Sequence, residues 1–367
     1  MPKPKVALVY DRVNTRYGGA EQVLLAIKSI FPEAPLFTSV YDPSQAKWSS
    51  EFEIKPSFLQ SWPGASRNHR WLAPLMPLAF ESLDLSEFEI VISITSAEAK
   101  GVITKPHQLH ICYLLTPTRY LYSHRHQYLE SVPFSKVIKP FLNHLTRWDQ
   151  VAITRPDVVI PISELVKERI KKYYHLSTEE VIYPPVELPT QIYPAPDLPF
   201  SKYFLSLSRL VDYKRIDLSI RACLKLGKNL VVAGDGPSMP RLKKMAQNSN
   251  QILFLGEVSS RAHHQLLAHS QALLMPGQED FGITALESNA HGRPVIIHQK
   301  SGAAEIISGI KIKNEFLSSL SEAIIDLDKH NFSSNKLSKY MKKYDKTVFV
   351  EKFKKIVDEK WRQHVRS

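Results

Sequence analysis

The chain has 367 residues, of which 43% are hydrophobic and 23% are charged, as in a globular protein. A single core rarely extends beyond about 300 residues, so this length predicts two domains. No run approaches about 20 apolar residues, which excludes a membrane-spanning helix. The two cysteines, Cys112 and Cys223, lie far apart, so we expect a reducing, cytoplasmic compartment and no disulfide or zinc cluster.

The formal net charge of +12 calls for an anionic partner or substrate. Basic residues are mixed with aromatic residues in the segments 67–71 and 122–126, and bases are concentrated in 167–172. Nucleic acid, an anionic membrane surface and a crowded phosphate site each fit this charge. No nucleic-acid-binding module appears, so we expect no nucleic acid partner and retain peripheral contact with an anionic membrane.

The pattern of the N-terminal half predicts alternating strands and helices. Lys5 to Tyr10 is typical of a buried strand, and Gly18-Gly19 follows it, ahead of apolar residues at helical spacing. Glu53 to Leu85 is rich in proline and aromatic residues without a clean period, so we expect short helices around a loop. Ser163 is the expected N-cap of a later helix. Further strands are expected at Ile90–Ile94, His110–Leu115 and Asp157–Pro161.

A proline-rich run from Pro184 to Pro199 has the composition of a linker. We therefore expect a first domain over 1–190 and a second over 198–345, with a final helix within 346–367. In the second domain we expect a helix start at 302–305 and then a short loop. The expected strands are Tyr203–Ser208, Leu230–Ala233, Ile252–Leu255, Ala272–Met275 and Arg293–Ile297. This alternation is typical of open α/β sheets, whose ligand sites lie along the carboxyl ends of the strands.

The stretch 276–295 predicts an anion site. A strand ends in Pro-Gly and a helix begins near Gly282, so the first amide groups of that helix lack intrahelical partners and can bind a phosphate. Glu279 lies in the loop before the helix and Glu287 lies inside it. Because a carboxylate accepts hydrogen bonds from hydroxyl groups and repels phosphate, this pattern fits a ligand with both groups, such as a nucleotide sugar.

Three ordered motifs of the second domain resemble those of the retaining family-4 glycosyltransferases. Glu279 and Glu287 are similar to the Glu-x7-Glu motif of that family, Arg209 and Lys214 to its Arg-x4-Lys element, and 234–237 to its Gly-Asp-Gly-Pro turn. A weaker N-terminal likeness extends the resemblance over most of the chain. It implies an α/β protein of GT-B fold: two Rossmann-like, doubly wound parallel-sheet domains that face a cleft, with the C-terminal helix packing back on the first.

The resemblance also implies roles for the charged residues. Arg209 and Lys214 would hold the donor diphosphate and neutralise the leaving group. Two cations ahead of a helix start are otherwise unfavourable, which supports a bound anion there. Glu279 would contact the hydroxyl groups of the transferred sugar, and Glu287 would bind the nucleotide ribose.

Backbone groups complete the implied site. The amides of Gly282, Ile283 and Thr284 would assist at the diphosphate, while Gly18 and Gly19 would lie near the donor diphosphate and the acceptor. We expect no separate cofactor, since the donor substrate is a GDP- or UDP-linked sugar. We also expect no metal ion: the Asp-Leu-Asp pattern at 326–328 follows apolar residues at helical spacing, which favours a solvated helix end.

Two positions depart from the family pattern. Leu115 stands where many members carry a histidine, and Ser96 where relatives often have a histidine after a serine pair. The loss of these imidazole groups leaves three explanations: another residue replaces them, the donor sugar is unusual, or the protein binds without efficient turnover. The candidate replacements are Glu98, His124 and His126.

The sequence therefore predicts a retaining hexosyltransferase that moves a mannose- or glucose-like sugar. The acceptor would be a polysaccharide, a glycolipid or a lipid-linked glycan, at the inner face of the membrane or in the cytoplasm. The alternative is a nucleotide-sugar-binding or partner protein on the same scaffold, with little turnover.

Overall fold

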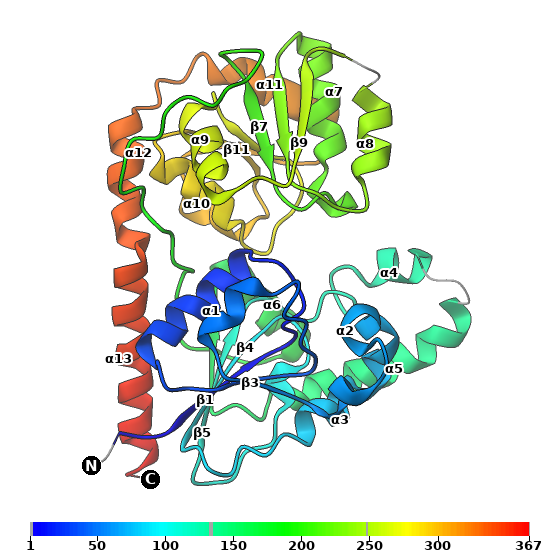
Figure 1. Cartoon of the computed structure of the whole chain (residues 1–367), viewed down its shortest axis with the longest axis vertical. Helices are drawn as coiled ribbons and strands as arrows, with labels where there is room; N and C mark the ends of the chain where they lie inside the picture. The colour runs from blue at the N-terminus through cyan, green and yellow to red at the C-terminus, as the bar shows by residue number, and fades with distance from the viewer. Residues whose placement is uncertain (1–2, 132–134, 247–248, 367) are drawn as a thin grey trace. The chain divides into compact units, whose positions relative to one another are not determined.

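A computed structural model describes residues 3–131, 135–246 and 249–366. The chain forms two compact units, which Figure 1 colours along the sequence. One unit combines Met1–Tyr183 with Phe349–Ser367, and the other is Pro184–Val348. The division falls at Pro184, the first residue of the proline-rich run.

The N-terminal unit is built on a six-stranded parallel sheet with the order β3-β2-β1-β4-β5-β6. Strands β1, β4 and β5 are buried along their whole length, which explains their continuous apolar runs. The order reverses between β1 and β4, and ligands bind open α/β sheets at such a point. The strands are β1 (Val6–Tyr10), β2 (Leu36–Thr38), β3 (Ile54–Pro56), β4 (Ile90–Thr95), β5 (Leu109–Leu114) and β6 (Val158–Pro161).

Helices flank this sheet (Figure 1). Ser163 caps α6 as expected, since its hydroxyl oxygen accepts a hydrogen bond from the N–H of Val166. The α-helices are α1 (Gly19–Ile30), α2 (Ala65–Asn68), α3 (Met76–Glu81), α4 (Arg125–Ser131), α5 (Ser135–Ala152), α6 (Glu164–Tyr174) and α13 (Lys346–His364).

The C-terminal helix α13 packs on the N-terminal unit. Phe349 and Phe353 meet the ring of Tyr113 on β5 edge to face, with centroid distances of 5.9 and 5.6 Å. Val357 is the next buried residue of this face. These contacts explain why the end of the chain belongs to the first unit.

The C-terminal unit repeats the architecture with a parallel sheet of order β12-β11-β10-β7-β8-β9. Its order reverses between β10 and β7. The strands are β7 (Phe204–Leu207), β8 (Leu230–Ala233), β9 (Ile252–Gly256), β10 (Leu273–Met275), β11 (Val295–His298) and β12 (Gly309–Ile312). The α-helices are α7 (Ile216–Leu226), α8 (Met239–Ala246), α9 (Ser260–His269), α10 (Ile283–Ala290), α11 (Leu317–Leu327) and α12 (Ser334–Met341).

The core of this unit lies between the sheet and helices α7 and α11. Leu274 and Ile296 from the sheet pack with Ile220 of α7 and Ile324 of α11, and each is at most 1% exposed. Burial of one such side chain contributes about 2 kcal/mol. The core therefore holds β10, and the loop that follows it, in a defined position.

Three elements differ from the sequence expectations. Strands β3 and β12 fall in segments that we interpreted as loop, and residues 302–305 form a single 3-10 turn instead of a longer helix. Both strands are short, lie at sheet edges and are only partly buried. Each strand is only three or four residues long, too short for its local pattern to identify it, and pairing with the neighbouring strand orders it.

Candidate active site

The candidate site lies at the carboxyl ends of β10, β7 and β8, beside the reversal of strand order. The backbones of the three loops that follow these strands are in close contact there. A Cβ atom on Gly234 would lie 2.0 Å from the carbonyl oxygen of Ser208, and one on Gly277 would lie 2.1 Å from that of Tyr213. Glycine at these two positions therefore lets the loops after β8 and β10 pack on the loop after β7.

Lys214 and Glu279 are in direct contact within this cluster of loops. The Lys214 Nζ donates to Glu279 Oε1, and the two side chains are 16% and 9% exposed. The backbone N–H of Glu279 donates to Ser301 Oγ at 3.0 Å, which anchors the loop after β10. The fold thus brings together one residue from the Arg-x4-Lys element and one from the Glu-x7-Glu pattern.

The other cations of the loop after β7 differ in their surroundings. Arg209 is exposed just beyond the end of β7. Arg215 has a positive φ of 54° and forms ion pairs with Asp217 at 3.1 Å and Glu315 at 2.7 Å. Arg215 therefore orders the loop, while Arg209 remains accessible to a ligand.

The start of α10 presents backbone amides. Gly282 is the N-cap of the helix with φ 99°, a conformation that favours glycine, and no side chain caps this end. Ile283 and Thr284 are half-buried, and amides at the first positions of a helix have no intrahelical acceptor. This geometry is suited to an anion.

Glu287 lies inside α10 and contacts a histidine that the sequence analysis missed. Its Oε2 lies 3.0 Å from Nε2 of His263 on α9. The available signal was a histidine in the first turns of the helix that follows residues 256–258. Nothing in the local pattern pairs that histidine with a carboxylate 24 residues later.

In the N-terminal unit, Gly18 is the N-cap of α1 and Gly19 begins the helix. Glu21 ties this loop to β1, since it accepts hydrogen bonds from the hydroxyl groups of Tyr10 at 2.8 Å and Thr15 at 3.2 Å. Burial raises the pKa of Glu21. A Cβ on Gly18 would lie 3.1 Å from Glu21 Oε2, so the glycine lets the carboxylate approach.

The two departures from the family pattern lie in one ordered region. Asp11 at the end of β1 accepts from the Ser96 N–H at 2.8 Å and from Thr95 Oγ1 at 2.6 Å. Leu115 is buried, and its N–H donates to the Thr95 carbonyl at 2.8 Å. Ser96 and Leu115 are therefore parts of a packed framework at the carboxyl ends of β1, β4 and β5.

The three candidate replacements have different environments. Glu98 is 3% exposed, receives a hydrogen bond from the Tyr120 hydroxyl, and lies 3.8 Å from the Arg12 guanidinium. Burial raises the pKa of Glu98. His124 bonds to the neighbouring serine hydroxyl, and His126 is exposed. Glu98 alone of the three is a buried titratable group.

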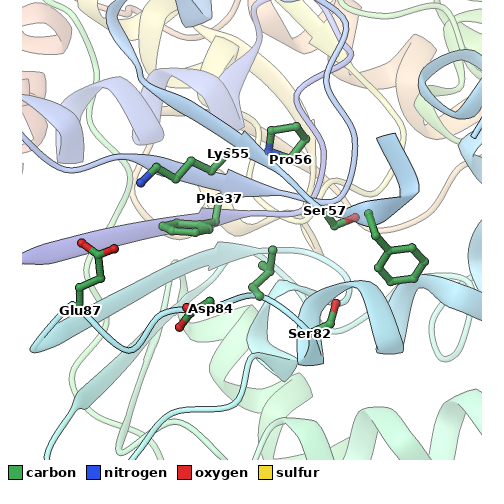
Figure 2. A pocket seen from close by; sticks show the side chains of 9 residues that line it. Phe37, Lys55, Pro56, Ser57, Ser82, Asp84 and Glu87 are labelled. Carbon is green, nitrogen blue, oxygen red and sulfur yellow. The ribbon is translucent and has the colours of Figure 1, made fainter. Parts of the chain in front are cut away.

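The basic segments do not form one described site. Lys171 and Lys172 are exposed in the last turn of α6. Within 67–71, the side chains of 68–71 lie outside those that the structure describes. A hollow of about 490 Å³ occurs elsewhere in the N-terminal unit, beside β2 and β3, and Figure 2 shows the side chains around it. None of the predicted site residues lines this hollow.

Among the described residues, no three His, Cys, Asp or Glu side chains are grouped so as to hold a metal ion. Asp326 at the end of α11 pairs with Lys329 at 2.8 Å, as on a solvated helix end. No helix in the described part of the chain has the length and apolar character needed to cross a bilayer.

The two-sheet architecture is the GT-B fold of glycosyltransferases. The chain superposes on sucrose-phosphate synthase from Thermosynechococcus elongatus with a TM-score of 0.74 and 14% identity, covering 98% of this chain and 100% of the other. Anabaena HepE, solved with UDP-glucose, gives 0.69 and 14% over 97% and 100%. The lipopolysaccharide outer core galactosyltransferase WaaB gives 0.68 and 17% over 97% and 99%.

Residues 198–347 match the family model of Glycosyl transferases group 1. A GDP-mannose-dependent alpha-(1-6)-phosphatidylinositol dimannoside mannosyltransferase of Mycobacterium tuberculosis is 40% identical over 107 residues, which are 27% of this chain and 28% of that protein. N-acetyl-alpha-D-glucosaminyl L-malate synthase of Bacillus anthracis is 30% identical over 187 residues, or 46% and 47% of the two chains. These matches, which span less than half of each relative, support the group 1 glycosyltransferase family.

Proposed function

We propose that this protein is a retaining glycosyltransferase that moves a hexose from a nucleoside diphosphate sugar to a polysaccharide, glycolipid or lipid-linked acceptor. The contact between Lys214 and Glu279 carries the proposal. It places an ammonium group and a carboxylate together at the reversal of strand order, in the unit whose α10 begins without a side-chain cap.

Different charged residues bind different parts of the donor. Lys214 and the exposed Arg209 bind the diphosphate and stabilise the negative charge that develops when the bond to the anomeric carbon breaks. The amides of Gly282, Ile283 and Thr284 add donors to the same phosphates. Glu279 accepts hydrogen bonds from sugar hydroxyl groups, and Glu287 from the ribose. These groups supply the charge stabilisation without a metal ion.

The relatives support a GDP- or UDP-linked donor. One is named as a GDP-mannose-dependent mannosyltransferase, and HepE was solved with UDP-glucose. A further relative is named alpha-monoglucosyldiacylglycerol synthase, 31% identical over 150 residues. Together with the net charge of +12, these names support a lipid-linked acceptor reached by peripheral contact with an anionic membrane on its cytoplasmic side.

The second candidate is a nucleotide-sugar-binding protein with little turnover. It is favoured by Leu115, a buried apolar side chain at the position where many members of the family carry an imidazole. In the transferase reading, Glu98 is the group that compensates. The two candidates differ in one measurable property, which is donor cleavage.

The experiment uses the full-length protein with GDP-mannose, UDP-glucose, UDP-galactose, ADP-glucose and a CMP-sugar. A thermal shift first identifies the donor that stabilises the fold. Release of the nucleoside diphosphate, or of CMP from the CMP-sugar, is then followed with and without EDTA. We expect slow release that EDTA does not change. Stabilisation without any release would establish the binding protein instead, and loss of activity in EDTA restored by Mg²⁺ would refute the metal-free assignment.

A further inference from the structure

His263 and Glu287 form a contact that the proposed roles do not use. They come from consecutive helices of the C-terminal unit, α9 and α10, which pack against each other. Nε2 of the imidazole lies 3.0 Å from Oε2 of the carboxylate. The side chains are 27% and 16% exposed, so the pair is partly accessible to a ligand.

The contact restricts what Glu287 can do. When Nε2 carries the proton, it donates to Oε2 and leaves Oε1 as the acceptor for a ligand hydroxyl group. A glutamate side chain that is already held in one rotamer loses less conformational entropy when it binds. The imidazole therefore holds the carboxylate in one orientation before the ligand binds.

A second contact fixes the position of α9 relative to α10. His264 Nδ1 lies 3.0 Å from His291 Nε2, and the ring of Tyr193 stacks on His264 at a centroid distance of 4.9 Å. Burial lowers the pKa of His264 and lowers that of His291 to about 4. Two neutral imidazoles can form this bond because one donates and the other accepts. The residue next to His263 is thus fixed independently of Glu287.

We propose that His263 is a positioning residue for ribose recognition, which orients Glu287 so that the protein distinguishes ribonucleotides from deoxyribonucleotides. This inference rests on the proposed function, in which Glu287 binds the ribose. It assigns to His263 a specificity role that the Glu-x7-Glu pattern does not contain.

Calorimetric titration tests the proposal. Wild-type protein is titrated with GDP, UDP, ADP and CDP, and the tightest of these is compared with its 2′-deoxy and 3′-deoxy forms and with inorganic pyrophosphate. We expect the wild type to bind the ribonucleotide about 10-fold more tightly than at least one deoxy form. His263→Leu should weaken ribonucleotide binding to the level of that deoxy form and leave the Kd of pyrophosphate unchanged.

Two further variants serve as controls. His263→Gln keeps an amide N–H that can reach Glu287 and should restore most of the discrimination. Gln265→Leu changes a neutral residue of the same helix that donates to the Pro194 carbonyl, and it should bind like the wild type.

The outcomes separate the inference from the function. If His263→Leu discriminates like the wild type, or loses pyrophosphate binding in parallel, His263 is not a positioning residue for ribose. The same conclusion holds if the wild type itself binds ribo and deoxy forms equally. If the wild type binds no nucleoside diphosphate at all, the proposed function is refuted, and the inference, which rests on it, is refuted as well.

Discussion

The ammonium group of Lys214 pairs with the carboxylate of Glu279 and thereby joins the loop after β7 to the loop after β10. The two residues are 65 positions apart in the sequence. In the proposed reaction the same ammonium group must also bind the donor phosphates. In that reaction the pair would hold the cation in place before the donor arrives and would orient the carboxylate toward the sugar.

Replacement of Lys214 by alanine should lower kcat by about 100-fold or more, because an electrostatic contact to the leaving group is lost. The measurement is release of the nucleoside diphosphate at saturating donor. Lys311→Ala removes an exposed lysine from β12 of the same unit and is the matched control. Wild-type turnover in the Lys214 variant would remove this residue from the site.

Glu279→Gln should separate binding from turnover. The amide keeps the shape but not the charge, so we expect kcat to fall by about 10-fold or more. Binding of the bare nucleoside diphosphate should stay equal or become tighter, because Lys214 no longer has a competing anion. Calorimetry and steady-state rates on the same preparation measure both. Parallel loss of diphosphate affinity would contradict a role at the sugar.

Gly277→Ala should destabilise the C-terminal unit by about 2 kcal/mol, since the added Cβ would lie 2.1 Å from the Tyr213 carbonyl oxygen. It should also reduce activity by shifting the loop of Lys214. Gly256→Ala is the control: its φ is +67° but its Cβ would meet nothing within 4 Å, so only the backbone conformation is strained, at about 1 kcal/mol. Urea unfolding compares the two, and equal losses would argue against the close approach.

Lys100→Met should lower the free energy of unfolding by about 3 kcal/mol, because it breaks a buried ion pair. Lys100 Nζ lies 2.5 Å from Asp149 Oδ1, and both side chains are at most 1% exposed. Asp149 also accepts hydrogen bonds from the hydroxyl groups of Thr118, at 2.7 Å, and Tyr174, at 2.7 Å. Lys105→Met at an exposed position should change stability by less than about 0.5 kcal/mol. Equal effects in urea unfolding would refute the structural role.

Acid should destabilise the N-terminal unit in part through His110. This side chain is fully buried on β5, and burial lowers its pKa to about 3. The unfolded state takes up a proton as the pH falls below 6.5, the ordinary pKa of a histidine side chain, whereas the folded state stays neutral. Stability is therefore lost as the pH falls from about 6.5 toward 3, with a slope of at most about 1.4 kcal/mol per pH unit.

His110→Leu removes this titration. Urea unfolding at pH 7 and pH 5 should show a smaller loss on acidification in the variant than in the wild type, whatever the carboxyl groups contribute in both. Identical losses would show that His110 is protonated in the folded state as readily as in the unfolded state.

Much of the framework was predictable because parallel strands buried on both faces leave continuous apolar runs. The strands β1, β4, β8 and β10 appear close to their expected positions for this reason. Gly282 was predicted to open α10, and it is the N-cap there. The short edge strands β3 and β12 could not be found in this way, since a neighbouring strand provides the hydrogen bonds that order them.

The amino-acid sequence by itself determined the α/β alternation, the positions of most core strands and the residue types of the site, because these depend on local periodicity and on motifs of a few residues. Only the tertiary structure decided which side chains meet. Lys214 contacts Glu279, and Glu287 contacts His263, because the reversal of strand order brings β7 beside β10 and packing brings α9 beside α10. Contacts between segments so distant along the chain depend on how the sheet is assembled, and no local pattern encodes them.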